Sequence, residues 1–276
     1  MGSTERRLGP ADLGGCLRLS QAAGWNQNEA DWRLMLGFGQ GWGIALEDGT
    51  LAASTLVLPY GERIAWIAMV LVLPGHRKQG HARRLLHTAL AELKRQQRTP
   101  ILDATPAGRA VYVQEGFGDC WDFSRWALSS FSSDRPSGGN AKPMTRLDWP
   151  RILEFDRRAF GADREVVLRN LAARLPEAAL VTEGGFVLGR DGREAYQLGP
   201  LVAKDEQTAR DLLGAALARV KPPLYLDLVD RLPGLKGWLQ ERGFVFQRPF
   251  TRMAHGAGGA PGDASLVCCP AGAELG

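Results

Sequence analysis

One pattern repeats within this 276-residue chain at a fixed spacing, and that spacing constrains the fold more than any other feature. "ARRLL" begins at Ala82 and "ARDLL" begins at Ala209, 127 residues later. "GF" recurs with the same offset, at Gly116 and Gly243. A strand-like segment between them departs from the offset by three residues, which small compensating insertions explain. The spacing therefore predicts two tandem copies of one domain.

A segment rich in Ser, Gly and Pro, "SSFSSDRPSGGNAKP", separates the two copies and is typical of a linker. We therefore expect a first domain at residues 1–128, a linker at 129–143, a second domain at 144–255 and a tail at 256–276. Strand-like and helical patterns alternate in both copies, which predicts an α/β fold with mixed central sheets flanked by helices.

The hydrophobic pattern of the first copy places its individual elements. We expect, in order, helices at 9–22 and 27–37, two or three strands within 43–73, a helix at 82–97, a strand at 100–105, a short helix through Tyr112, and a strand pair after "EGFG". The helix at 82–97 would cross over between two parallel strands of the sheet. The second copy repeats this order of elements.

Composition excludes several classes of protein. The net charge of +4 and the pI near 9.0 are too mild to support a nucleic-acid partner. The longest apolar run, Ile64–Leu73, is too short to cross a bilayer as a helix and predicts a buried strand. Four cysteines lack the spacing of a metal site, so we expect reduced thiols, no metal and a soluble cytoplasmic protein.

A basic glycine loop follows that apolar run and opens the helix at residue 82. The loop is "GHRKQGHARR", and no acidic residue lies between Arg63 and Ala91. Unpaired backbone N–H groups and the positive end of a helix dipole bind phosphate groups. Gly80 would let a ligand approach the backbone closely. A solvated basic face at an ordinary helix start is the alternative.

The order of three motifs resembles the GNAT superfamily of acyl-CoA N-acyltransferases. A strand that ends in Val72-Leu73-Pro74 precedes R-x-x-G-x-A, which begins at Arg77. Tyr112 then stands four residues before Gly116-Phe117. The chain as a whole resembles tandem members whose first copy is intact and whose second copy has diverged.

This resemblance implies a set of residues that bind the donor, acetyl-CoA. The set comprises Val70, Leu71, Val72, Arg77, Lys78, Gln79, Gly80, His81, Ala82, Arg83 and Thr105. Thr105 stands where the family often has Asn, and its hydroxyl would contact the pantetheine arm. A backbone N–H within Val70–Val72 would stabilise the negative charge that develops on the thioester oxygen.

The resemblance also implies that Tyr112 is the general acid that protonates the departing sulfur. The residues do not identify the general base: Asp103 and Glu62 are candidates, and a chain of water molecules is an alternative. In the GNAT fold the first two helices line the acceptor entrance, which places Trp25, Asn26 and Gln27 there. Capping by Asn26 and packing by Trp25 are the alternative roles.

The second copy lacks the donor motif. The 127-residue offset places Gln207 opposite Gly80 and Leu239 opposite Tyr112. We therefore expect this copy to keep the fold, to bind no coenzyme A and to contribute to the acceptor site, with Asp227 as one candidate. The predicted activity is transfer of an acetyl group to a primary amine of a small molecule in a ternary complex. A non-catalytic regulator that binds acyl-CoA is the alternative function.

Overall fold

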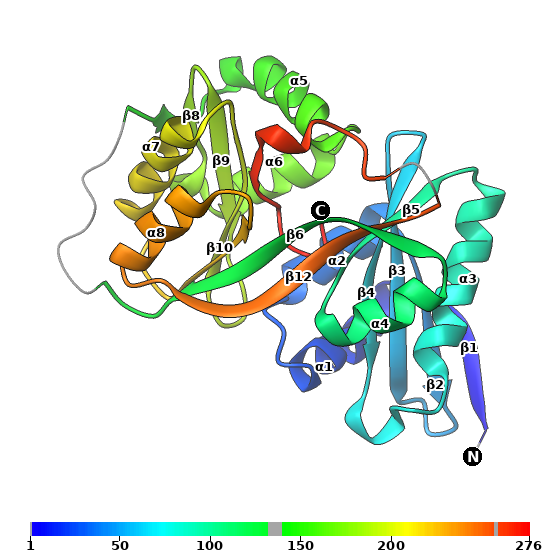
Figure 1. Cartoon of the computed structure of the whole chain (residues 1–276). Helices are drawn as coiled ribbons and strands as arrows, with labels where there is room; N and C mark the ends of the chain where they lie inside the picture. Colours follow the sequence, from blue (N-terminus) through cyan, green and yellow to red (C-terminus); the bar gives the residue numbers. More distant parts are fainter. Residues whose placement is uncertain (1, 132–139, 257–258) are drawn as a thin grey trace. The chain divides into compact units, whose positions relative to one another are not determined.

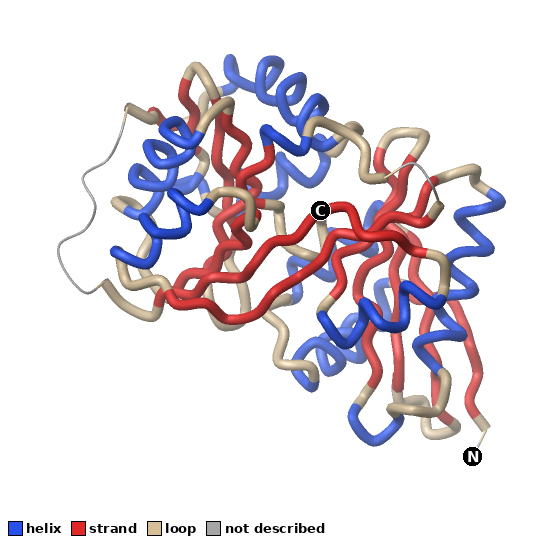
Figure 2. The backbone as a smooth tube through the Cα atoms, in the orientation of Figure 1, coloured by secondary structure: helices blue, strands red, loops and turns tan. Residues whose placement is uncertain are grey.

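The computed structural model describes residues 2–131, 140–256 and 259–276, and the chain divides into two compact units. The first unit comprises residues 1–102 and the second residues 103–276. Figure 1 labels the elements, and Figure 2 separates helices from strands and loops. The expected linker at 129–143 lies largely outside the described residues.

A five-stranded sheet organises the first unit, in the order β1-β2-β3-β4-β5. Neighbouring strands are antiparallel except for β4 and β5, which are parallel. The elements are β1 (Ser3–Leu8), α1 (Leu13–Ala22), α2 (Glu29–Phe38), β2 (Gln40–Leu46), β3 (Leu51–Tyr60), β4 (Ile64–Val72), α3 (His81–Arg95) and β5 (Thr99–Ala104), whose last two residues belong to the second unit. β1 is a strand that the hydrophobic pattern did not predict.

Helix α3 connects the parallel strands β4 and β5, as the sequence predicted. Its apolar side chains recur at helical spacing, and Leu85, Leu86, Ala89 and Leu93 are buried. The helix packs on β3 and β4. This crossover fixes the start of α3 at the end of β4, so the basic loop lies between a strand end and a helix N-terminus.

The second unit is built on a longer sheet in the order β12-β6-β11-β10-β9-β8-β7, and β13 pairs with β10. Among the strand pairs described for this unit, β10 and β11 are the one parallel pair. The elements are α4 (Pro106–Gln114), β6 (Phe117–Leu128), β7 (Lys142–Pro143), α5 (Trp149–Phe160), α6 (Glu165–Arg174), β8 (Leu180–Thr182), β9 (Gly185–Arg190), β10 (Tyr196–Ala203), α7 (Glu206–Leu217), β11 (Leu224–Val229), α8 (Pro233–Glu241), β12 (Val245–His255) and β13 (Val267–Cys269).

β6 is a single strand of 12 residues, so the strand pair expected after "EGFG" is wrong. Its partners come from the distant part of the chain, because it pairs with β12 on one side and β11 on the other. Figure 1 shows β6 and β12 as a long antiparallel ribbon. The division after Leu102 therefore places α4 and β6 in the second unit. The domain boundaries at 128 and 144 remain predictions.

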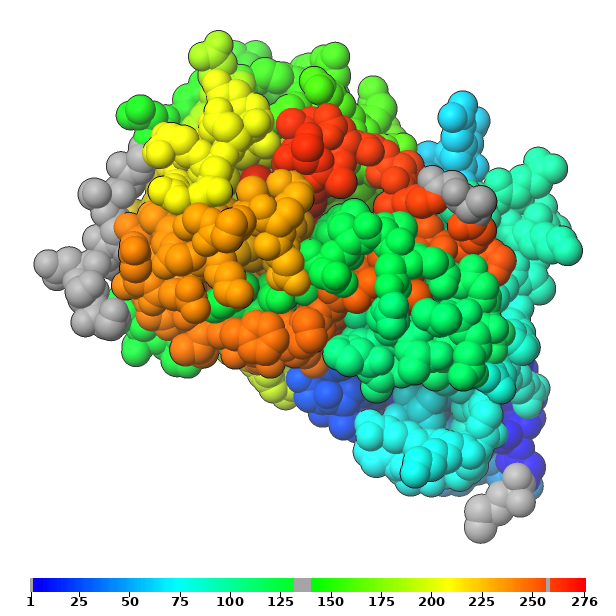
Figure 3. Space-filling model, viewed as in Figure 1, coloured from blue at the N-terminus to red at the C-terminus, as the bar shows by residue number. Residues whose placement is uncertain are grey.

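The C-terminal residues are part of the folded second unit. Cys269 and Val267 of β13 pair with β10, and both are buried. The Arg231 guanidinium donates hydrogen bonds to the carbonyls of Ala264, Ser265 and Val267. Figure 3 shows this red segment against the orange atoms of the same unit. The four cysteines are free thiols. Over the described ranges, no helix is both long and apolar enough to span a membrane.

Candidate functional site

The last third of β4 departs from regular strand geometry. Met69 has a φ of 53°, and the pairing register with β3 shifts between Ser54 and Leu56. The Ser54 hydroxyl donates a hydrogen bond of 2.8 Å to the Met69 carbonyl, which holds the bulge. A bulge adds a residue and turns the strand that follows it. The segment that carries Val70 and Val72, both half-buried, therefore leaves the regular pleat.

β4 and β5 pair over part of their length. Their parallel register runs from Ile64–Thr99 to Trp66–Ile101, whereas β4 continues to Val72. Beyond Trp66 and Ile101 no further pairing of β4 with β5 is described, so a β4 N–H that faces β5 there would be open to a hydrogen-bond acceptor. The family resemblance implied an amide donor for the thioester oxygen in this place.

The N-terminus of α3 offers backbone donors to solvent. Gly80 is the N-cap residue, with a φ of 81° and no side chain to accept from the first N–H groups. The first turn contains no acidic residue. A Cβ at residue 80 would meet no atom within 4 Å, so the cap faces open space. Lys78 also has a positive φ, 61°. This arrangement of glycine cap, free N–H groups and helix dipole is suited to an anion.

Several basic side chains lie near the start of α3, and they differ in whether they are free to bind an anion. Arg77, Lys78 and Gln79 are exposed, and the Arg77 Nε donates to the Val72 carbonyl at 3.3 Å. Arg84 is held by Glu5 at 2.7 Å, which removes it from the set of groups available to a ligand. Arg77 and Lys78 are therefore the loop side chains best placed to add charge to the site.

His81 is buried at the first position of α3. Burial lowers its pKa, and the neighbouring charges of His76 and Arg84 lower it further. The buried Nε2 atom has no hydrogen-bond partner among the residues that the structure describes. A neutral imidazole with an open nitrogen contributes hydrogen bonding rather than charge to the loop.

Thr105 is the N-cap of α4. Its hydroxyl oxygen accepts from the Gly108 N–H at 3.3 Å, the usual role of a threonine before a helix. The hydroxyl proton is still available to a ligand. The predicted contact with pantetheine is not tested by this geometry and stays a prediction.

Tyr112 lies in the last turns of α4 and is half-buried. Its ring packs against Phe117, with 5.7 Å between ring centroids. Gly108 makes room for the ring, because a Cβ there would lie 3.1 Å from Cε2 of Tyr112. Burial raises the pKa of Tyr112 to about 12. The phenol is thus held in its protonated form at neutral pH.

Asp103, one of the two candidate bases, is paired through a side chain that is fully buried. Arg252 donates two hydrogen bonds of 2.9 Å to its carboxylate, and the guanidinium lies 4.1 Å from the centroid of the Trp121 ring. Burial raises the pKa of Asp103, and the Arg252 charge opposes that shift. The other candidate, Glu62, is exposed in the turn between β3 and β4. Sequence reasoning did not identify Arg252.

The segment between α1 and α2 brings Trp25, Asn26 and Gln27 together. Asn26 and Gln27 are buried, with 1% and 3% exposed, and Trp25 is half-buried. The Gln27 Oε1 atom has no partner among the described residues. The residue that caps α2 is Asn28, which accepts from the Asp31 N–H at 3.2 Å, so the capping alternative for Asn26 is wrong. The Gln27 Oε1 atom is therefore the acceptor in this segment that is available for a hydrogen bond from a ligand.

The corresponding helix start in the second half has carboxylates where α3 has none. Asp205 caps α7, accepting from the Thr208 N–H at 2.7 Å, and this hydrogen bond lowers its pKa. Glu206 follows in the first turn and pairs with Arg210. Leu239 lies fully buried in α8, a helix whose bounds match those of α4 at the 127-residue offset. This half therefore has no open anion site at the start of α7, and a leucine stands in α8 at the position that corresponds to Tyr112.

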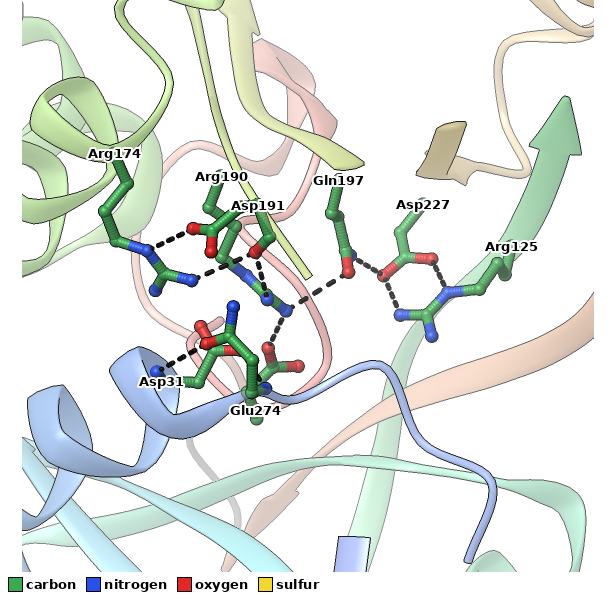
Figure 4. Close-up of polar contacts among 9 residues, drawn as sticks. Asp31, Arg125, Arg174, Arg190, Asp191, Gln197, Asp227 and Glu274 are labelled. Atoms are coloured by element: carbon green, nitrogen blue, oxygen red, sulfur yellow. Dashed lines mark hydrogen bonds and ion pairs between the residues drawn. The ribbon is translucent and has the colours of Figure 1, made fainter. Parts of the chain in front are cut away.

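Asp227 lies at the centre of a buried polar chain, which Figure 4 shows. Its carboxylate receives two hydrogen bonds from Arg125, of 2.7 and 2.8 Å, and a third of 3.0 Å from Gln197. Arg190 donates to Gln197 at 3.3 Å and also pairs with Glu274. These five side chains are at most 3% exposed. Asp227 therefore organises its neighbours, and both of its oxygens are already engaged.

Two protein-family models match the chain, one in each half. The model described as "Acetyltransferase (GNAT) family" matches residues 16–117. The model described as "Acetyltransferase (GNAT) domain" matches residues 152–267. The two matches confirm the internal repeat that the spacing predicted.

Relatives and solved structures agree with this division. The chain is 23% identical over 246 residues to an uncharacterized N-acetyltransferase, YitH, of Bacillus subtilis, with 86% of each chain covered. It is 26% identical over 174 residues to the holothin acyltransferase of Pseudoalteromonas, with 61% of this chain and 58% of that protein covered. A crystal structure of a putative acetyltransferase from Pyrococcus horikoshii has a TM-score of 0.79 at 18% identity and covers 100% of this chain and 96% of its own. A GCN5-related N-acetyltransferase from Sphaerobacter thermophilus has a TM-score of 0.66 at 18% identity, covering 96% and 98%. At these identities, the structures show a shared fold.

Proposed function

Because the chain is a GNAT acetyltransferase with one GNAT domain in each half, we propose that it transfers an acetyl group from acetyl-CoA to a primary amine of a small molecule. The observation that carries this proposal is the glycine-capped start of α3 after the bulged end of β4. The donor and the acceptor would be bound together, and transfer would be direct.

The residues around α3 fit the anionic part of the donor. The first N–H groups of α3, with the exposed Arg77 and Lys78, would hold the pyrophosphate. The Thr105 hydroxyl would donate to the pantetheine arm. Helix dipole, backbone donors and basic side chains all favour negative charge at the same point.

We expect a Gly80→Glu variant to bind acetyl-CoA at least about 10-fold more weakly, a loss of about 1.4 kcal/mol. The new carboxylate would stand at the N-cap, where it would accept hydrogen bonds from the free N–H groups of α3 and repel the pyrophosphate. Isothermal titration calorimetry with acetyl-CoA measures this change.

Gly259→Glu is the matched control. Gly259 is exposed, with a φ of 65° and open space around its Cβ position, so the substitution brings comparable backbone strain at a residue that has no part in the proposed donor site. The control is expected to keep wild-type affinity. Equal affinity of the two variants for acetyl-CoA would contradict the pyrophosphate site.

The chain's own groups supply three functions to the reaction. Bound acetyl-CoA would supply an activated thioester. A backbone N–H of the Val70–Val72 segment would donate a hydrogen bond to the thioester oxygen as negative charge develops there. The Tyr112 Oη would then donate its proton to the departing sulfur. The proton lost by the amine would pass to Asp103, to Glu62 or to solvent.

We infer that residues 144–255 bind no second donor. Asp205 and Glu206 place carboxylates at the start of α7, and Asp205 already accepts a helix N–H. Calorimetry is expected to give one acetyl-CoA per chain, and Gly80→Glu is expected to remove that single binding event. Two binding events per chain, or a residual site of wild-type affinity in the Gly80→Glu variant, would show that the second copy binds the donor.

A further inference from the structure

A row of charged side chains crosses three strands of the second unit. In the pairing register, Arg125 of β6 lies opposite Arg248 of β12 on one side and opposite Asp227 of β11 on the other. Directly paired residues of adjacent strands project from the same face of the sheet, with Cβ atoms about 5 Å apart. Two guanidinium groups and one carboxylate are therefore neighbours on one face of β12-β6-β11.

The Asp227 carboxylate already has hydrogen-bond partners at both of its oxygens, and Arg248 is not one of them. Arg125 binds Asp227 with two parallel hydrogen bonds, and Gln197 occupies a further acceptor position. Glu274 is in turn paired with Arg190, as Figure 4 shows. The buried chain thus contains two cations and two anions and is balanced without Arg248.

Arg248 is left as a surplus cation beside this balanced chain. It is half-buried, and its Nε atom is buried without a hydrogen-bond partner. Within the described ranges no carboxylate pairs with it, and its one recorded contact is with the Phe250 ring at 5.4 Å. Burial lowers its pKa, and so does the neighbouring charge of Arg125, although Asp227, Tyr225 and Glu274 oppose that shift. A counterion would compensate for the hydration that this half-buried guanidinium loses.

The side chain of Arg248 and its surroundings indicate which kind of anion would pair with it. The N–H donors of a guanidinium lie in one plane and can form two parallel hydrogen bonds to the oxygens of an oxyanion. A single surplus positive charge in a partly dehydrated place is balanced by one negative charge, which favours a carboxylate over a phosphate dianion. The Phe250 and Tyr225 rings near the two arginines provide apolar contact for the carbon skeleton of such a ligand.

The β6–β12 ribbon also contacts the proposed general acid, which lies on α4. Tyr112 packs against Phe117, the first residue of β6, and Phe117 pairs with His255 at the end of β12. Arg125 and Arg248 lie further along this ribbon, eight residues from Phe117 on β6, a path of at most about 26 Å between Cα atoms. A ligand held at Arg248 can therefore be an acceptor whose anionic group is remote from its amine.

We propose that Arg248 binds the carboxylate of the acceptor, so that the acceptor class is an amine that carries a remote carboxylate. This inference rests on the proposed acetyltransferase function. Arg248 is the residue that contacts the ligand. Arg125 and Asp227 are positioning residues, because their ion pair lies next to Arg248 on the same face of the sheet.

The test compares acids with their neutral amides. The wild type is assayed for coenzyme A release with amino acids of increasing length, 4-aminobutyrate, 8-aminooctanoate and 12-aminododecanoate, each against its carboxamide. We expect kcat/KM to favour the acids by at least about 10-fold, through KM. Arg248→Met is expected to abolish that preference, and Arg248→Lys to retain part of it.

Arg242→Met is the matched control, because Arg242 also has an unpartnered buried Nε atom but stacks on Trp238 at 3.8 Å.

A preference for acids that survives in Arg248→Met, or a stronger preference for 3-aminopropyl phosphate than for any acid, would overturn the proposal. Binding is also measured without turnover, by titrating each acid into wild type and Arg248→Met saturated with coenzyme A. Binding by no acid would overturn the carboxylate site. Arg248-dependent binding without transfer to any amine would instead overturn the proposed acetyltransferase function and leave the carboxylate site standing.

Discussion

Replacement of Tyr112 by phenylalanine is expected to lower the turnover number by about 100-fold or more. The substitution keeps the ring that packs against Phe117 and Gly108 and removes only the hydroxyl. Without a proton donor, the sulfur would have to leave as a thiolate. Because the hydroxyl acts in the transition state, kcat should fall while the affinity for acetyl-CoA changes little. Steady-state kinetics combined with calorimetry separates these two effects.

Tyr196→Phe is the matched control, since it removes a phenol hydroxyl from a 39% exposed side chain of the same unit. Its turnover number should match that of the wild type. The pH profile adds a second readout: with a pKa of about 12, Tyr112 stays protonated at lower pH, so its ionisation should cause no loss of rate between pH 7 and about pH 11. Wild-type turnover by Tyr112→Phe would show that another group protonates the sulfur.

Replacement of Asp227 by asparagine is expected to lower the free energy of unfolding by about 3–5 kcal/mol. Asp227 and Arg125 are both buried, at 0% and 2% exposed. Removing the negative charge leaves Arg125 uncompensated beside Arg248, and one buried cation without a partner is costly. Urea unfolding followed by far-UV circular dichroism measures the loss.

Two further variants test whether burial of the Arg125–Asp227 pair causes the expected loss in the free energy of unfolding. Asp119→Asn breaks an exposed pair with Arg109, and it should cost less than about 1 kcal/mol because solvent already screens those charges. The double variant Arg125→Met with Asp227→Leu removes both buried charges and should be clearly more stable than Asp227→Asn alone. A small effect of Asp227→Asn, similar to that of Asp119→Asn, would contradict the buried network.

The parts of the site that depend on local sequence were predicted well. The strand, the glycine loop and the helix start near residue 82 follow from neighbouring residues, and α3 begins at His81. Local reasoning chose the wrong cap for α2, since Asn26, Gln27 and Asn28 are all polar residues at the same helix start. Asn28 is the one followed three residues later by Asp31, which completes a capping box.

Pairings between distant residues could not be predicted from one sequence. The arginines at 125, 190, 248 and 252 look like ordinary strand residues, because a sequence does not show which charges become buried. The one available signal was their position within strand-like alternation, as in "DFSRWAL", where Arg125 shares a face with Phe123. The partner strands of β6 also follow it in the chain by about 100 residues, and no local pattern indicates such a pairing.

The placement of β6 between β11 and β12 has a consequence for biosynthesis. A nascent chain emerges from the ribosome N-terminus first, so β6 appears long before Leu224, the first residue of its β11 partner. At roughly 5–20 residues per second, this strand waits several seconds with both of its edges unpaired. During that interval its buried side chains Phe123, Trp126 and Leu128 are exposed to other chains. The sheet of the second unit therefore cannot form around β6 until β11 and β12 have been synthesised, and a newly made chain is most prone to aggregation before that point.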